Sequence, residues 1–220
     1  MPVLDEARRL EEALATVLGH ACQVVVVDGG STDDSVAIAT AAGATVVRSP
    51  RGRALQMNAG ADALAPGWQA VLFLHADTRL PPDWADSVRE ALHAGAAWGR
   101  FDVRLQSEHP LLAVVGAMMN LRSRLSGICT GDQAIFIRAA AWRDSGGYPS
   151  IRLMEDVEIS ARLKRCAGAP AALRGPVRVS ARRWESHGVW RTIWTMWSLR
   201  LRYFLGESPD SLHQRYYRRP

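Results

Sequence analysis

The sequence predicts an α/β fold, in which a mostly parallel sheet is flanked by helices and followed by a C-terminal helical extension. Up to about residue 105, short β-branched runs alternate with helical patterns, as in parallel sheets whose two faces are covered. Polar segments follow the predicted strands, where open α/β sheets bind ligands. The end of the chain is rich in tryptophan and arginine. We expect one α/β domain over residues 1–183 and amphipathic helices over 184–220.

The spacing of apolar residues, together with helix-start and turn signals, sets the expected elements. We expect helices over 6–18, 35–42, 53–64, 82–93, 111–125, 157–165, 187–205 and 209–217. We expect strands over 24–27, 45–47, 71–74, 98–105, 134–137 and 177–180. Residues 1–4 resemble the last residues of a strand, so we expect a first strand whose beginning is absent.

Composition narrows the class of protein. The 220 residues suffice for one domain with a buried core. Three cysteines without metal or redox spacing favour a reducing, cytoplasmic compartment. No signal peptide is visible, and no apolar run approaches the roughly 20 residues of a membrane span. The net charge of +5 comes from the tail, because residues 174–220 contain ten arginines and three acids. Recognition motifs for nucleic acid are lacking, so we expect none to bind.

The segment Asp28–Asp33 follows the strand over 24–27. Its glycines permit a tight turn with close approach of a ligand, and Asp28 would accept hydrogen bonds from a nucleobase or ribose. The alternative is a capped strand-to-helix turn with a solvated aspartate. A dinucleotide-binding GxGxxG pattern is missing.

A histidine and an acid follow the strand over 71–74. His75 and Asp77 point to the same side of an extended chain. They would form half of a site for a hard divalent cation, with diphosphate oxygens and water completing it. The alternative is a packed histidine beside an aspartate at a helix start.

Three further segments carry charge. Arg51 and Arg53 flank a glycine at a predicted helix start, an arrangement that suits phosphate binding. The alternative is a solvated basic turn. Gly131-Asp132-Gln133 precedes a strand, and Glu155-Asp156 opens a helix. Paired acids at a helix N-terminus commonly only offset the helix dipole, but the same position holds a carboxylate rigidly enough for a general base.

Taken together, these motifs resemble the family 2 inverting glycosyltransferases, which have the GT-A (Rossmann-like) fold. The resemblance covers about residues 2–165 and is closest to small bacterial members of the family. It rests on the order and rough spacing of Pro2–Glu6, Val26–Asp33, Gly52-Arg53-Ala54, Phe73–Asp77 and Glu155-Asp156.

The resemblance implies specific roles. Asp28 would contact the donor nucleoside and Arg53 its diphosphate, Asp77 would bind Mg²⁺ or Mn²⁺, and Asp156 would be the catalytic base, with Glu155 beside it. The remaining expected donor-binding residues are Pro2, Asp5, Glu6, Gly29, Asn58, His75 and Ala76. On the acceptor side we expect Gly131, Asp132 and Gln133, and the expected additional metal ligands are His75 and, more weakly, His187.

Two departures from the family pattern leave the donor open. Gly29 stands where the family often has a second acid, so a contact to the base is expected to be lost and the choice between a UDP sugar and a GDP sugar stays open. His75 stands where the first acid of the Asp-x-Asp motif usually stands, which leaves the identity of the metal open.

The tail carries an apolar stripe. Trp190, Ile193, Trp194, Trp197, Leu201 and Phe204 recur at spacings of three and four. Tryptophan flanked by arginine suits a membrane interface, which would bring a lipid-linked acceptor within reach at the inner face of the cell membrane. The alternatives are that the stripe packs on the domain or on a second subunit in a homodimer.

Two other functions remain open. A sugar nucleotidyltransferase has a similar sheet, but it normally needs a glycine-rich N-terminal loop that this chain lacks. A non-catalytic module that binds nucleotides or a membrane surface through the basic tail is the third reading.

Overall fold

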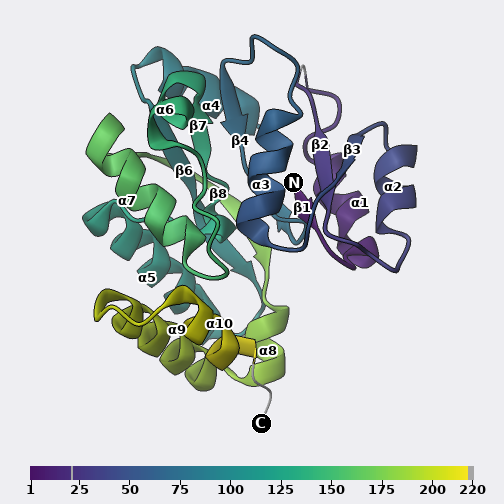
Figure 1. The fold of residues 1–220 in the computed structure, drawn as a ribbon. Helices are drawn as coiled ribbons and strands as arrows, with labels where there is room; N and C mark the ends of the chain where they lie inside the picture. Colours follow the sequence, from purple (N-terminus) through teal and green to yellow (C-terminus); the bar gives the residue numbers. More distant parts are fainter. Residues whose placement is uncertain (21, 218–220) are drawn as a thin grey trace.

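The computed structural model describes residues 1–20 and 22–217, and its strands form two sheets (Figure 1). The first sheet is fully parallel, in the order β1-β2-β3, and its strands are Pro2–Val3, Val25–Asp28 and Thr45–Arg48. The second has the order β4-β7-β6-β8-β5, and its strands are Ala70–Leu72, Phe136–Arg138, Trp98–Gln106, Ala171–Ser180 and Thr78–Arg79. The α/β class is confirmed.

The second sheet is mixed. The long pair β6–β8 is parallel, whereas β7 runs antiparallel to β4 and β6, and β5 runs antiparallel to β8. The expected parallel pairing is present in β1-β2-β3 and in β6–β8, whereas the antiparallel pairs of β7 and β5 make the second sheet mixed. Strand direction there depends on long-range pairing, which local spacing does not encode.

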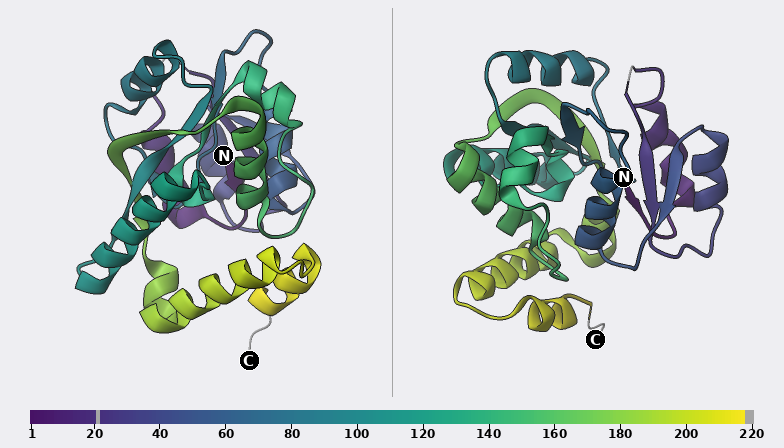
Figure 2. Two further views of the ribbon diagram at one scale, coloured as in Figure 1. Left: turned by 90° about the vertical axis from the view of Figure 1, so that its left-hand side faces the viewer. Right: turned by 45° about the horizontal axis from the view of Figure 1, so that its top comes forward.

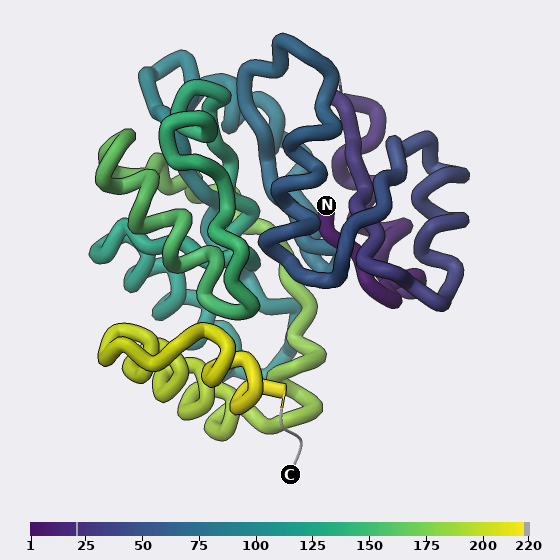
Figure 3. The backbone as a smooth tube through the Cα atoms, viewed as in Figure 1, coloured from purple at the N-terminus to yellow at the C-terminus, as the bar shows by residue number. Residues whose placement is uncertain are grey.

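Helices cover both sheets (Figures 1 and 3). The N-terminal five are α1 (Ala7–Ala15), α2 (Ser35–Ala41), α3 (Arg53–Asp62), α4 (Trp84–His93) and α5 (Pro110–Ser126). The others are α6 (Ala139–Ser145), α7 (Glu155–Ala167), α8 (Arg182–His187), α9 (Val189–Phe204) and α10 (Pro209–Tyr217). The sequence patterns missed the short elements α6, α8, β5 and the 3-10 turn η1 (Gly131–Gln133).

Two buried clusters hold the strand ends in place. One contains Leu10, Val26 and Phe101. The other contains Trp98 and Ile137, and the Trp98 indole donates a hydrogen bond to the Gly168 carbonyl at 2.9 Å. Because fully buried apolar side chains tolerate little displacement, these clusters fix the loops that follow β2 and β4.

A cavity of about 460 Å³ lies between residues of the first sheet and residues of the second. Its lining includes Val24, which precedes β2, Val25 of β2 and Val71 of β4, together with residues of α3 and α4. None of the predicted site residues lines this cavity, so the expected chemistry lies elsewhere.

The C-terminal helices form a separate layer below the sheets (Figure 2). Leu199 of α9 packs with Met154, Val157 and Leu212 in a small buried cluster. The tryptophan stripe points the other way, because Trp194 is 77% exposed. The alternative in which this stripe packs on its own domain is therefore wrong. Among residues 1–20 and 22–217, no helix is both long and apolar enough to span a bilayer.

Candidate active site

The loop after β2 is held by Asp28. This side chain is buried and accepts hydrogen bonds from the backbone N–H groups of Gly30 (3.1 Å) and Ser31 (2.9 Å). Burial acts to raise the pKa of Asp28, but hydrogen bonds from Ser31 and Gly30 and the charge of Arg48 outweigh it and lower the pKa. Asp28 thus stays ionised and shapes the loop that the resemblance assigns to the donor nucleoside.

Asp5 joins the first loop to the same segment. Its Oδ1 atom accepts hydrogen bonds from Thr32 N (2.8 Å) and Oγ1 (3.2 Å), and its own N–H donates to Ser31 Oγ at 3.0 Å. Asp5 has a φ of 52°, a left-handed conformation that is uncommon outside glycine and found at functional loops. The structure therefore brings Asp5 and Asp28 to one loop pair.

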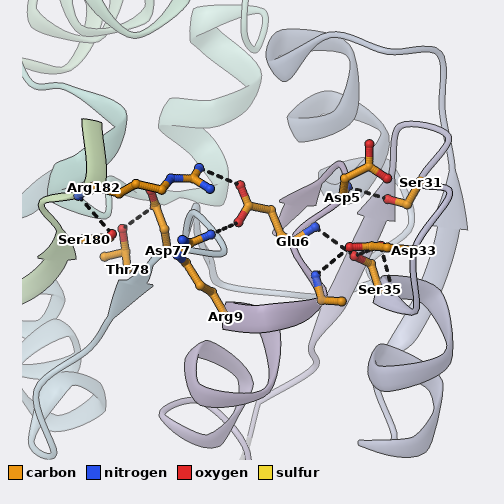
Figure 4. Close-up of polar contacts among 11 residues, drawn as sticks. Asp5, Glu6, Arg9, Ser31, Asp33, Ser35, Asp77, Thr78, Ser180 and Arg182 are labelled. Atoms are coloured by element: carbon orange, nitrogen blue, oxygen red, sulfur yellow. Dashed lines mark hydrogen bonds and ion pairs between the residues drawn. The ribbon is translucent and has the colours of Figure 1, made fainter. Parts of the chain in front are cut away.

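Figure 4 shows how this loop pair is connected to Asp77. Glu6 lies 3.2 Å from Arg9 and 3.8 Å from Arg182. The Arg182 N–H donates to Ser180 Oγ, and the Ser180 N–H donates to the Asp77 carbonyl at 3.1 Å. Glu6 and Asp77, expected from distant motifs, thus belong to one polar network.

Gly29 is required by a residue that the sequence patterns missed. Buried Gln56 of α3 donates from Nε2 to the carbonyls of Val3 (2.9 Å) and Val27 (2.8 Å), at the ends of β1 and β2. A Cβ atom at Gly29 would lie 3.0 Å from that Nε2 atom. Gln56 therefore connects the ends of β1 and β2. The sequence signal that could have identified it is a hydrophilic side chain among the apolar residues of a predicted helix.

His75 meets the acceptor-side segment. Its Nδ1 lies 3.5 Å from Asp132 Oδ1, and a Cβ atom at Gly131 would lie 2.6 Å from its Nε2. Only glycine permits this close approach of the ring. The surrounding protein acts to raise the pKa of Asp132, but His75, Arg53 and Arg183 outweigh it and lower the pKa. The structure brings His75, Gly131 and Asp132 together.

Asp156 lies at the first turn of α7. Its Oδ2 atom accepts a hydrogen bond from Gly131 N at 3.0 Å, and its Oδ1 atom accepts one from Val157 N at 2.8 Å. Before it, Met154 adopts a left-handed conformation with a φ of 69°, an arrangement that costs free energy in a side chain of this size. The carboxylate is therefore held rigidly beside the His75 loop.

Glu155 is buried and pairs with Arg53, whose Nη1 lies 3.9 Å from Glu155 Oε1. Burial and the neighbouring charge of Asp156 raise the pKa of Glu155 to about 7, against the opposing effect of Arg53. The surrounding protein acts to lower the pKa of Arg53, but Glu155, Asp132 and Asp156 are among the groups that outweigh it and raise the pKa. Arg53 thus remains a cation beside these acids.

Three arginines outside the predicted set face the same acids. Arg122 of α5 has a buried Nη2 atom with no hydrogen-bond partner among the described residues, and burial and the charge of Arg200 lower its pKa to about 10. Burial also lowers the pKa of Arg200, against the opposing effect of Asp156. The guanidinium of Arg183 lies 4.6 Å from the centre of the Tyr216 ring. The basic tail was visible in the sequence, but not which arginines turn inward.

Several expected residues make contacts within the fold. Asn58 exchanges hydrogen bonds with the backbone of Tyr148 at 2.8 and 2.9 Å. Gln133 is buried and caps η1 by accepting from Thr130 N. His187 Nδ1 contacts Ser186 and Arg183. Pro2 pairs with β2, and Ala76 is buried in the core.

A metal would need ligands from the substrate. In the part of the chain that the structure describes, no three His, Cys, Asp or Glu side chains are grouped to hold an ion. Asp77 is half-buried, and its carboxylate receives one long hydrogen bond, from Thr78 at 3.4 Å. Mg²⁺ and Mn²⁺ are commonly held by one or two carboxylates plus phosphate oxygens, so Asp77 fits such an ion when a diphosphate is bound.

One protein-family model matches more than half of the chain. The family model described as glycosyl transferase family 2 matches residues 1–143. The chain belongs to glycosyl transferase family 2. The matched region includes the Asp28, Arg53 and Asp77 segments and the Gly131 turn, whereas Asp156 and the C-terminal helices follow it. A comparison with curated proteins finds no match.

Solved structures of GT-A glycosyltransferases share this fold. S. aureus TarS (residues 1–349) gives a TM-score of 0.66 at 16% identity over 82% of this chain and 59% of that chain. The mannosyltransferase PcManGT from Pyrobaculum calidifontis, in complex with GDP-Man and Mn²⁺, gives 0.60 at 19% identity over 81% and 54%. Glucosyl-3-phosphoglycerate synthase from Mycobacterium tuberculosis, with Mn²⁺ and UDP, gives 0.57 at 19% identity over 81% and 68%. The chain thus spans a little over half the length of the first two.

Proposed function

We propose that this family 2 protein is an inverting glycosyltransferase, which moves a sugar from a UDP or GDP donor to an acceptor hydroxyl with the help of Mg²⁺ or Mn²⁺. The observation that carries the proposal is the position of Asp156. Its carboxylate is fixed by two backbone N–H groups at a helix start, next to the His75 and Arg53 groups. A general base needs this combination of rigidity and charge.

The donor would lie across the loop pair of Asp5 and Asp28. Leaving of the diphosphate builds negative charge, which Arg53 would stabilise, and Arg183 would add a second cation. Asp77 would hold the metal ion, which supplies further stabilisation of the leaving group when bound. These side chains come from different elements of the sheet edge, as expected for a ligand at strand ends.

The acceptor would enter from the side of Asp132 and Asp156. Asp156 would take the proton from the acceptor hydroxyl as this oxygen attacks the anomeric carbon from the face opposite the diphosphate. The bond to the diphosphate oxygen breaks in the same step, so the anomeric configuration inverts. Glu155 pairs with Arg53 and would keep that cation in position.

The solved relatives support this assignment without fixing the nucleotide. TarS has been solved with UDP and with UDP-GlcNAc, and PcManGT with GDP-Man and Mn²⁺. Because Gly29 replaces a possible second acid, we propose UDP and GDP sugars as the donor class.

A donor screen tests the proposal. The melting temperature of the full chain is measured with UDP, GDP and their sugars, each with and without Mn²⁺, because a ligand that binds only the folded state raises it. We expect one nucleotide series to raise the melting temperature, and Mn²⁺ to increase the shift. The absence of a shift with every nucleotide would contradict the proposal.

A further inference from the structure

Helix α9 presents a continuous apolar face to solvent. Four large side chains on it, Trp190, Trp194, Trp197 and Phe204, are each 69 to 77% exposed. Their spacings of four, three and seven place them on one side of the helix. Soluble proteins rarely leave such a large aromatic surface uncovered, so a partner surface is expected here.

The opposite side of α9 holds the helix to the protein. Thr192 and Leu199 are its buried residues, and they lie about 180° around the helix from the aromatic face at roughly 100° per residue. Leu199 packs with Met154 and Val157. Because this inner side is already packed, the aromatic face is free to bind a partner without unfolding the tail.

Charge distinguishes between the partners that could cover this face. Arg191 and Arg202 are exposed and lie on the flank of this face at roughly 100° per residue. Arg202 also pairs with Glu207 at 3.2 Å, but arginines outnumber acids by ten to three from residue 174 onward. A second copy docked face to face would bring these like charges together, whereas anionic lipid headgroups would neutralise them. Tryptophan and arginine side by side are typical of helices that lie in a membrane interface.

We propose that the aromatic face of α9 docks onto an anionic membrane surface. Asp156 lies between Met154 and Val157, which pack against the inner side of α9, so the helix would separate this carboxylate from the membrane by about one helix diameter, ~10 Å. From this placement we infer that the acceptor is a lipid-linked hydroxyl compound. This inference about the acceptor rests on the proposed transfer reaction.

Vesicle flotation of the full chain tests the docking. The vesicles contain phosphatidylcholine alone or phosphatidylcholine with phosphatidylglycerol. We expect flotation with the anionic vesicles, weakened by salt, and a loss of roughly tenfold or more in binding for the triple variant Trp190→Gln/Trp194→Gln/Trp197→Gln. The variant Arg191→Gln/Arg202→Gln should lose the preference for anionic lipid.

A matched variant on another helix provides the control. Val114, Met118 and Leu125 of α5 are also exposed apolar residues, and their triple change to Gln should leave flotation unchanged. Equal loss in both triple variants, or equal flotation of the tryptophan variant and the natural chain, would overturn the proposal. The proposal would also be overturned if the natural chain does not float and instead forms a dimer in solution that the tryptophan changes dissociate.

The folding of each variant and the transfer reaction are checked separately. The altered tryptophans are exposed, so the melting temperature and its shift with donor nucleotide should stay as in the natural chain. If the tryptophan variant keeps the donor-induced rise in melting temperature but no longer floats, docking is supported. If the natural chain floats but no donor raises its melting temperature, the proposed function is contradicted and the docking is still supported.

Discussion

At the scale of single residues, the site depends on how the fold sets the charge of a few carboxylates. Among the residues that the structure describes, the carboxylate of Asp77, a predicted metal ligand, receives one long hydrogen bond, from Thr78 at 3.4 Å. Asp28 accepts hydrogen bonds from the loop after β2 with both carboxylate oxygens, and Asp5 accepts them with Oδ1. The sequence could assign these acids to the strand ends, but it could not tell which of them hold the loop and which are free.

Asp77→Ala should remove the effect of Mn²⁺ on donor binding, because the resemblance assigns the metal to this carboxylate and its long hydrogen bond from Thr78 leaves it able to bind an ion. Donor affinity is measured by calorimetry with and without Mn²⁺, and Asp62→Ala, an exposed acid at the end of α3, is the control. Metal-enhanced binding that persists in Asp77→Ala at the natural strength would show that the metal is held elsewhere.

Glu155 should make stability depend on pH. Its pKa is raised from 4.5 to about 7, so the folded state binds this proton more tightly than the unfolded chain. The stabilisation is present below about pH 4.5 and is lost as the pH rises through about 7, by up to about 3 kcal/mol. Urea unfolding on both sides of this window should show the loss, and Glu155→Gln should remove it. The exposed Glu90→Gln is the control, and an equal pH dependence in Glu155→Gln would refute the assignment.

At the scale of elements, the long helices and the short strands β2, β3, β4 and β7 were predicted, whereas α6, α8, β5 and η1 were not. The helix expected over 157–165 begins at Glu155, because both acids of the motif lie inside its first turn. The strand expected over 134–137 is confirmed as β7, but the missed turn η1 and helix α6 directly flank it. These elements are fixed by contacts such as Gly131 with His75, which only the folded chain brings together.

Gly131→Ala should disturb both stability and activity. The added Cβ would lie 2.6 Å from His75 Nε2, so the ring or the turn must move, at a cost of about 1–3 kcal/mol. Unfolding by urea and donor turnover measure the two effects. In the double variant with His75→Ala the stability cost of Gly131→Ala should vanish; an equal cost in both backgrounds would mean that the ring contact is not its cause.

At the scale of the whole molecule, the site joins the two sheets and the tail. Glu6 reaches Arg182, Arg53 pairs with Glu155 of α7, and Arg200 of α9 lies near Asp156. The GT-A fold and the family were predictable from five ordered motifs, and both are confirmed. The inward arginines and the exposed tryptophans were not, since helical spacing gives a stripe without saying which side the protein covers. The roles of the site residues stay predictions.

The most direct test of the account is donor turnover by Asp156→Asn, measured as release of nucleoside diphosphate with the donor found in the screen. The amide keeps the shape of the side chain but cannot act as a base. We predict an unchanged donor-induced rise in melting temperature and a loss of turnover of about 100-fold or more, with Asp144→Asn, an exposed acid of α6, unaffected. Turnover by Asp156→Asn at the rate of the natural chain would contradict the account.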